Sequence, residues 1–121
     1  MAEKNLFTYD EGDDSLTFIN SGLEGDHTID TGFMLITLDK EGKVSALELM
    51  GAKKNFKMDD TILSNLSRAN VDIKFHPEKR NLIVTINLYS DAPTPHVIVN
   101  NVNSDESLVD GKYTFKKTVS V

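Results

Sequence analysis

Two apolar runs separated by a five-residue turn are the feature that most restricts how this chain can fold. Residues 33–38 are almost all apolar, and residues 44–49 return with apolar positions around Ser45 and Glu48. The connector 39–43 carries Gly42 near its end. A short glycine-containing loop between two β-rich runs is typical of a β-hairpin. We therefore expect an antiparallel hairpin over 33–49, preceded by a short strand over 27–30.

Similar patterns occur on both sides of this hairpin. Residues 6–9 and 15–20 flank an acidic turn at 10–14, which predicts a second hairpin. Later runs in which apolar and polar residues alternate predict further strands, because alternation marks a half-buried strand. These runs are 71–75, 82–89 and 112–119. A further strand is expected over 96–99, and the polar segment 100–111 is expected to be a loop.

One helix is expected between the two groups of strands. Ile62, Leu63 and Leu66 recur at spacings that place them on one stripe of a helix. The acidic pair at 59–60 suits a helix start, and Asn70 suits a stop. Since no βαβ alternation occurs, the pattern predicts an α+β domain in which an antiparallel sheet of hairpins packs against this single helix.

The length of 121 residues predicts a single domain. The chain has no cysteine, which excludes disulfides, thiolate metal sites and cysteine nucleophiles. No apolar run approaches the roughly 20 residues of a membrane helix, and the first residues do not resemble a signal peptide. We therefore expect a cytoplasmic protein with no membrane partner, and no sequence motif predicts a cofactor.

Charge is distributed unevenly along the chain. The net charge is −6, and residues 1–30 contain eight acidic residues and one basic residue. An acidic surface repels phosphate groups, so a nucleic-acid partner is not expected. The acidic segment could attract a basic protein, or it could simply be a solvated surface that keeps the protein soluble.

Asp10, Asp13 and Asp14 are the candidate metal ligands, because clustered carboxylates suit a hard cation such as Ca²⁺ or Mg²⁺. The segment does not match an EF-hand loop, since no glutamate closes it at the required position. The alternative interpretation is that these carboxylates accept backbone N–H bonds and hold the turn. The three histidines lack the spacing of a zinc site.

Four acidic residues are candidates for contact with a partner: Asp10, Asp14, Asp30 and Glu48. Glu48 stands between two leucines on an expected strand, so it would face away from the core. It could act as a general acid or base if that face lay in a cleft. The alternative is that it is solvated or paired with Lys43 or Lys74. No residue is assigned a catalytic role.

Several segments of residues 7–66 together resemble the YuzE-like family of small uncharacterised bacterial and archaeal proteins. They are Tyr9-Asp10 with Asp14, Leu16 and Phe18, then the segments 29–33 and 39–49. The resemblance implies a small antiparallel sheet with a helix and no established activity. Because some relatives are thought to lie beside small toxin genes, it also implies an antitoxin-like role. Residues 70–121 form a C-terminal extension of β-strands beyond this region.

These observations favour a non-enzymatic protein-interaction module that binds a protein partner or associates with itself. The alternative is a small carboxylate-based metal- or ligand-binding protein or enzyme. The two hypotheses differ in where the acidic side chains should lie. The alternative requires the acidic side chains to converge on one cleft.

Overall fold

Nine strands and two short helices make up the part of the chain, residues 5–117, that the computed structural model describes. The strands are β1 (Asn5–Asp10), β2 (Ser15–Asn20), β3 (His27–Asp30), β4 (Met34–Leu38), β5 (Val44–Met50), β6 (Arg68–His76), β7 (Asn81–Tyr89), β8 (His96–Asn103) and β9 (Gly111–Lys117). The helices are α1 (Ala52–Phe56) and α2 (Asp60–Asn65), which lie between β5 and β6.

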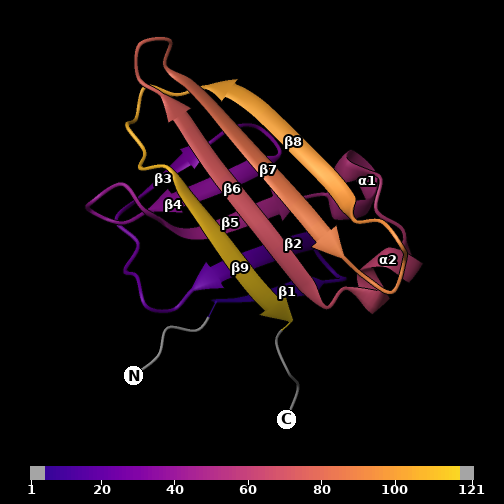
Figure 1. Ribbon diagram of the computed structural model, residues 1–121. Helices are drawn as coiled ribbons and strands as arrows, with labels where there is room; N and C mark the ends of the chain where they lie inside the picture. The colour runs from indigo at the N-terminus through magenta and orange to yellow at the C-terminus, as the bar shows by residue number, and fades with distance from the viewer. Residues whose placement is uncertain (1–4, 118–121) are drawn as a thin grey trace.

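All nine strands belong to one sheet with the order β3-β4-β5-β2-β1-β9-β6-β7-β8. Neighbouring strands are antiparallel except at the centre, where β1 and β9 run parallel and pair through Leu6 with Lys116 and Phe7 with Lys117. The sheet curls at this pair, so that β6–β9 lie across β1–β5 as a second layer (Figure 1). The C-terminal extension therefore shares one sheet with the N-terminal half, a question that the sequence left open.

The core lies between the two layers because most of the strands carry buried apolar residues at alternate positions. In the N-terminal layer Met34, Ile36 and Leu38 of β4 are fully buried. In the C-terminal layer the same holds for β7, where the buried residues are Leu82, Val84, Ile86 and Leu88. Two sheet faces with this alternation each remove the other's apolar surface from water, which is the main stabilising contribution in such a fold.

Three phenylalanines join the layers near the β1–β9 pair. The ring of Phe18 lies 5.9 Å from that of Phe7 and 5.3 Å from that of Phe115, centroid to centroid, and the second pair has an edge-to-face arrangement. Phe18 and Phe7 come from the N-terminal layer and Phe115 from β9. All three side chains are almost completely buried, so this cluster holds the curl of the sheet closed.

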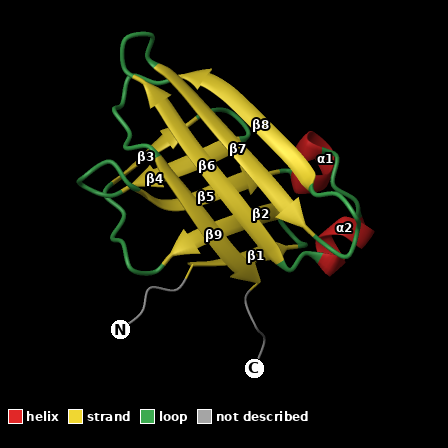
Figure 2. Cartoon of the chain, viewed as in Figure 1, coloured by secondary structure: helices red, strands yellow, loops and turns green. Residues whose placement is uncertain are grey.

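The expected α+β class, a sheet packed against a single helix, is wrong. Strands hold 54% of the described residues and helices 10%, so the fold is mostly β. Both helices lie together beside one end of the two layers, and neither covers a sheet face (Figure 2). The physical reason is that the C-terminal strands supply the second apolar face. The sheet therefore needs no helix to cover it.

Two element boundaries also differ from expectation. Asp59 does cap α2, since its Oδ1 accepts a 2.8 Å bond from Ile62 N, but the helix ends at Asn65. The expected continuation to Asn70 is wrong, because those residues pair with β7 and β9 as part of β6. Strand β8 extends to Asn103, through part of the segment expected to be a loop. The hairpins β1–β2 and β4–β5 and the strand β3 are confirmed.

Candidate functional site

Asp14 is the most highly bonded of the predicted site residues. It has a left-handed backbone (φ 53°), and its carboxylate accepts bonds from the Tyr9 hydroxyl at 2.7 Å and from Lys53 N at 3.0 Å. A weaker bond comes from Lys54 N at 3.3 Å, and its carbonyl oxygen accepts from Gly51 N and Ala52 N. Asp14 thus ties the β1–β2 turn to the start of α1. This matches the interpretation in which the carboxylate holds a turn.

The ionisation of this group follows from its bonds. Burial and the hydrogen bond to the Asp14 carboxylate together raise the pKa of Tyr9 to about 12. Burial also acts to raise the pKa of Asp14. The bonds from Tyr9 and from the two backbone N–H groups, with the Lys53 ammonium nearby, outweigh burial and leave the pKa of Asp14 below its ordinary value. The pair is therefore a neutral phenol and a carboxylate at neutral pH.

A small pocket of about 380 Å³ opens beside this pair, between β1, α2 and the end of β9. Its polar lining includes Tyr9, Glu11, Asp60 and Lys117. The Asp60 carboxylate pairs with the Lys53 ammonium, and the Lys117 ammonium donates to the carbonyl of Ser64 at 3.4 Å. The hydrogen bond to Asp60 raises the pKa of Lys53, so this ion pair persists at neutral pH. Tyr9, Asp60 and Lys117 therefore each have a partner within the described residues.

Asp10 and Asp30 each accept backbone N–H bonds in their own turns, and Asp13 is exposed in the Asp10 turn. Asp10 Oδ1 accepts from Gly12 N at 2.9 Å and from Asp13 N at 3.3 Å. Asp30 Oδ1 accepts from Gly32 N at 2.8 Å, where Gly32 adopts a positive φ of 98°. Short aspartate side chains that bond the backbone two residues later are a common way to fix a turn. Across residues 5–117 no group of three or more His, Cys, Asp or Glu side chains is arranged to hold a metal ion.

Glu48 lies on the outer face of the N-terminal layer, as expected from its leucine neighbours. Its cross-strand neighbours are Thr17 on β2 and Leu35 on β4. Leu35 also pairs with Asp30, so Glu48 and Asp30 lie two strands apart, about 10 Å, with an apolar side chain between them. The expected pairing with Lys43 is not seen, because that ammonium lies 3.5 Å from Glu41. Asp10, Asp14, Asp30 and Glu48 do not converge on one cleft.

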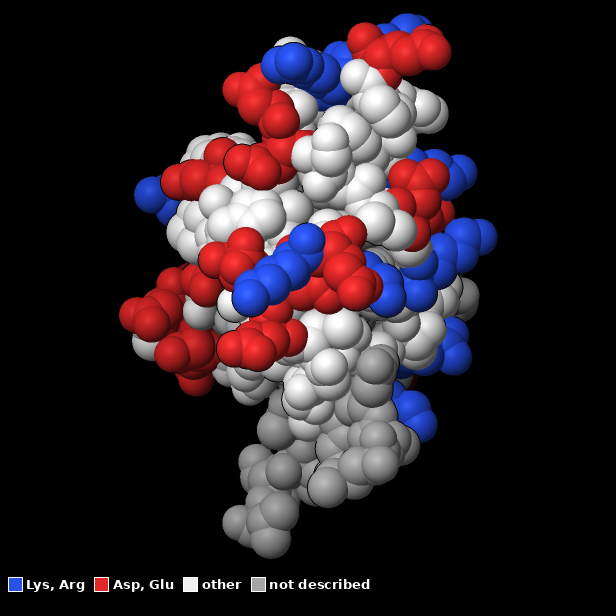
Figure 3. Space-filling model, turned by 90° about the vertical axis from the view of Figure 1, so that its left-hand side faces the viewer, with Lys and Arg blue, Asp and Glu red and all other residues white. Residues whose placement is uncertain are grey.

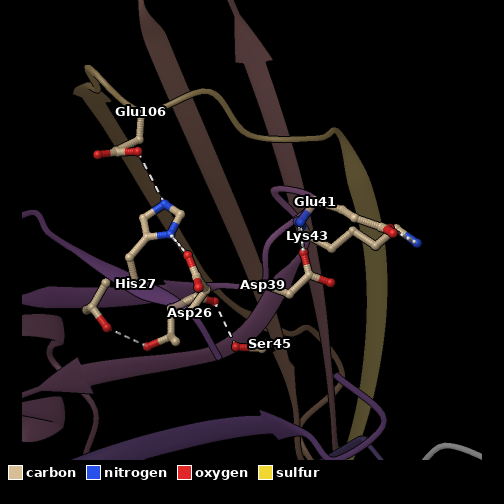
Figure 4. Close-up of polar contacts among 9 residues, drawn as sticks. Asp26, His27, Asp39, Glu41, Lys43, Ser45 and Glu106 are labelled. Atoms are coloured by element: carbon tan, nitrogen blue, oxygen red, sulfur yellow. Dashed lines mark hydrogen bonds and ion pairs between the residues drawn. The ribbon is translucent and has the colours of Figure 1, made fainter. Parts of the chain in front are cut away.

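A separate acidic region lies at the opposite end of the N-terminal layer. Loops after β2, β4 and β8 meet there, and acidic side chains crowd this side of the molecule (Figure 3). His27 stands between two carboxylates, with Nδ1 3.0 Å from Asp26 and Nε2 3.2 Å from Glu106 (Figure 4). The Nε2 approach lacks hydrogen-bond geometry, so it is an electrostatic contact only. Asp39 is buried but accepts from Glu41 N and Lys43 N, which leaves it engaged in its turn.

The sequence reasoning missed the surface that differs most from the rest of the chain. Strands β7 and β8 contain no Asp, Glu, Lys or Arg, in a protein of which 26% of residues are charged. Their outward positions hold small polar and apolar side chains, and Val97 and Val99 of β8 are 51% and 63% exposed. We refer to residues 81–89 and 96–103 as the neutral strip. The absence of charge was readable in the sequence, but the adjacency of the two strands at an edge was not.

Strand β8 is the last strand of the sheet, and among residues 5–117 only β7 pairs with it. Ser104 N donates to Arg80 O at 2.9 Å, one step beyond the Asn81–Asn103 pair. Hydrogen-bonded pairs alternate along an antiparallel ladder, so even-numbered residues of β8 direct their backbone groups to β7. The backbone N–H and C=O groups of the odd-numbered residues therefore point outward. We call these groups the β8 edge, and they belong to Val97, Val99, Asn101 and Asn103.

The β8 edge is held in place from the core side. His96 Nε2 bonds the carbonyl of Phe56 at 3.0 Å, and Asn100 Nδ2 donates to Thr31 Oγ1 at 3.2 Å. The opposite edge of the sheet is different, because β3 has only four residues and ends in Asp30, with Asp26 just before it. Short length and charge are common protections of an edge strand, and β8 has neither.

Comparison of the chain with known protein families, with curated proteins and with solved structures found no match. The resemblance to the YuzE-like family therefore stays a prediction. Neither helix of the described chain is long and apolar enough to cross a membrane.

Proposed function

We propose that this protein is a non-enzymatic interaction module that binds a protein partner by strand addition at the β8 edge. The observation that carries the proposal is a free edge strand of eight residues without a single charge, in a chain with a net charge of −6. Main-chain groups on such an edge supply the hydrogen bonds of strand addition, and alternate side chains supply selectivity.

The arrangement of the acidic residues supports the non-enzymatic part of the proposal. Asp10, Asp14 and Asp30 hold turns, and Glu48 faces outward beside Leu35. Mechanisms that use paired carboxylates, such as glycoside hydrolysis, place two such groups at one reacting centre, and these four residues do not form such a pair. The cytoplasmic location expected from the sequence is part of this proposal. The antitoxin-like role implied by the YuzE-like resemblance is one form of it, in which the partner is a small basic toxin.

Site-specific photo-cross-linking tests this function. The chain has no cysteine, so Asn101→Cys introduces a single thiol on β8 that takes a benzophenone maleimide. Val109 lies in the loop after β8, and 44% of it is exposed. Val109→Cys therefore gives a matched label away from the edge. The labelled proteins are irradiated in an extract of the organism that makes them, and the adducts are identified by mass spectrometry.

We expect an adduct from position 101 and none of the same mass from position 109. A second change, Val99→Pro, should abolish the adduct, because it removes an outward N–H of the β8 edge. The absence of any adduct specific to position 101, or an adduct that persists with Val99→Pro, would contradict the proposed function.

A further inference from the structure

We infer that the partner at the β8 edge is a second copy of this chain, paired antiparallel about a two-fold axis at Asn100. This inference rests on the proposed function, since it names the partner of the same edge. Two-fold symmetric dimers are the commonest oligomers, and they require a surface that is complementary to itself. The β8 edge meets this requirement in its charge, in its hydrogen-bonding groups and in its side-chain pattern.

Charge is the first argument. Each copy carries a net charge of −6, so two copies repel each other over most of their surface. The neutral strip is two strands wide. On the neighbouring strand β6 the charged residues of the same face are Arg68, Asp72 and Lys74, which lie beside Tyr89, Thr85 and Ile83. With β8 paired to β8, equivalent β6 strands lie five strand spacings apart, about 24 Å. That exceeds the screening length of about 8 Å at physiological salt, so like charges do not oppose this approach.

Register is the second argument. A two-fold axis perpendicular to the sheet keeps the outer faces of both copies on the same side, so residues opposite each other must share a face. Pairing centred on Asn100 places Val99 opposite Asn101 and Val97 opposite Asn103 of the second copy. All four residues of the β8 edge then exchange backbone bonds with an outward-facing partner. A register centred on Val99 would instead place Asn103 opposite Pro95, which has no N–H to donate.

Side-chain pattern is the third argument. On the outer face this register places the exposed valines Val97 and Val99 beside asparagines of the second copy, with no charge against either. On the core side it places Ile98 opposite Val102, which joins two apolar residues at the rim of both cores. The strand is also held in place before pairing, through His96 and Asn100, so little conformational entropy is lost on association.

Light scattering after size exclusion, over a series of protein concentrations, tests the inference. The expected mass of the unmodified protein rises toward twice the 13.5 kDa of one chain. Val99→Pro should raise the dissociation constant by about tenfold or more, because the outward N–H is lost and the ring blocks the edge. Val99→Thr is the matched control, since it keeps the β-branched shape and the N–H, and it should dimerise like the unmodified chain.

Val99→Pro should keep the fold, because the N–H that it removes makes no bond to β7, and a thermal melt checks this. Asn101→Lys is the second variant in case Val99→Pro does not fold. It places a positive charge on the outer face of each copy at the pairing line, and it should also weaken the dimer.

Disulfide formation tests the register. Val99→Cys and Asn101→Cys chains should form a disulfide when mixed, because these positions lie directly opposite each other. Neither chain should form one alone, since residue 99 of one copy then lies about 8 Å from residue 99 of the other. If either variant alone formed a disulfide between its copies more readily than the two variants form one when mixed, the register centred on Asn100 would be overturned.

The outcomes separate the inference from the proposed function. A monomer at all concentrations, together with a position-101 adduct to a different protein, would overturn self-pairing and leave the interaction module standing. A monomer with no edge-specific adduct would overturn both. A dimer that survives both Val99→Pro and Asn101→Lys would place the interface elsewhere and overturn the inference.

Discussion

The Tyr9 hydroxyl donates a 2.7 Å hydrogen bond to Asp14 Oδ1, and the same carboxylate receives two backbone N–H groups at the start of α1. One side chain thus connects the first β-hairpin to a helix that begins 38 residues later. The first three predictions concern this connection, and the other two concern the second helix and the core.

Replacement of Asp14 by alanine should lower the free energy of unfolding by about 2 kcal/mol. The change removes the cap of α1 and leaves the Tyr9 hydroxyl without its partner, and it also places alanine in a left-handed backbone. Asp14→Asn should cost less, because asparagine tolerates this backbone and keeps one acceptor oxygen. Urea denaturation measures both. Asp13→Ala, at an exposed neighbouring position, is the control and should stay within about 0.5 kcal/mol.

Stability at acid pH should also depend on Asp14. Its pKa is lowered on folding, so its contribution is present above the ordinary value of 3.8 and is lost as pH falls from there through the lowered pKa. The difference in unfolding free energy between the unmodified protein and Asp14→Asn should therefore shrink as pH falls below about 4. Urea denaturation at a series of pH values measures it. A constant difference over this range would show that the folded-state pKa of Asp14 is not lowered.

Tyr9 should ionise late in an alkaline titration. Its pKa rises from 10.0 to about 12 on folding, so the protonated phenol stabilises the fold below pH 10, and this contribution is lost between pH 10 and 12. The tyrosinate absorbance of the unmodified protein minus that of Tyr9→Phe isolates this residue among the three tyrosines. A midpoint near 10 in the difference curve would contradict the bond to Asp14 in solution.

Loss of the α2 cap should have a smaller, local effect. Asp59→Ala removes the side-chain acceptor of Ile62 N and should cost about 1 kcal/mol of unfolding free energy. Asp91→Ala removes the same side chain from an exposed position in the loop before β8, and it should change stability by less than half as much. Equal effects of the two variants would mean that the cap does not form. Thermal melts of the two variants provide the comparison.

The aromatic cluster should be the most sensitive part of the core. Phe115→Ala removes a buried ring that packs edge-to-face on Phe18 across the two layers, and it should cost about 3–5 kcal/mol. Phe33→Ala is the matched control, because Phe33 is 59% exposed and should change stability by no more than about 0.5 kcal/mol. Denaturant midpoints compare the two. Similar losses would mean that the layers do not close over Phe115.

The local elements of this fold were largely predictable, because each rests on neighbouring residues. The β1–β2 and β4–β5 hairpins follow from apolar runs around short turns, and the cap of α2 follows from Asp59 at its start. The helix boundary was not predictable, because Arg68 to Asn70 join β6 only through pairing with β7 and β9. If the helix continued through these residues, they could not form the backbone hydrogen bonds that pair them with β7 and β9.

The candidate site was predictable only in part. Asp10 and Asp30 hold turns through bonds to residues only two or three positions ahead, so a local sequence pattern can predict this role. The role of Asp14 depends on Lys53, 39 residues away, so no local pattern could reveal it. The lack of charge in 81–89 and 96–103 was visible in the sequence, yet its meaning depends on β8 being an edge strand.

The sequence by itself determined that this chain forms short antiparallel strands with one apolar face each, since side-chain alternation and turn residues act over a few positions. Only the tertiary structure decided what covers those faces. The parallel β1–β9 pair curls the sheet so that its two halves bury each other, and the helices lie beside one end. The same closure leaves β8 at the border of the sheet with β7 as its single neighbour among the described strands, because strand order is set by long-range packing.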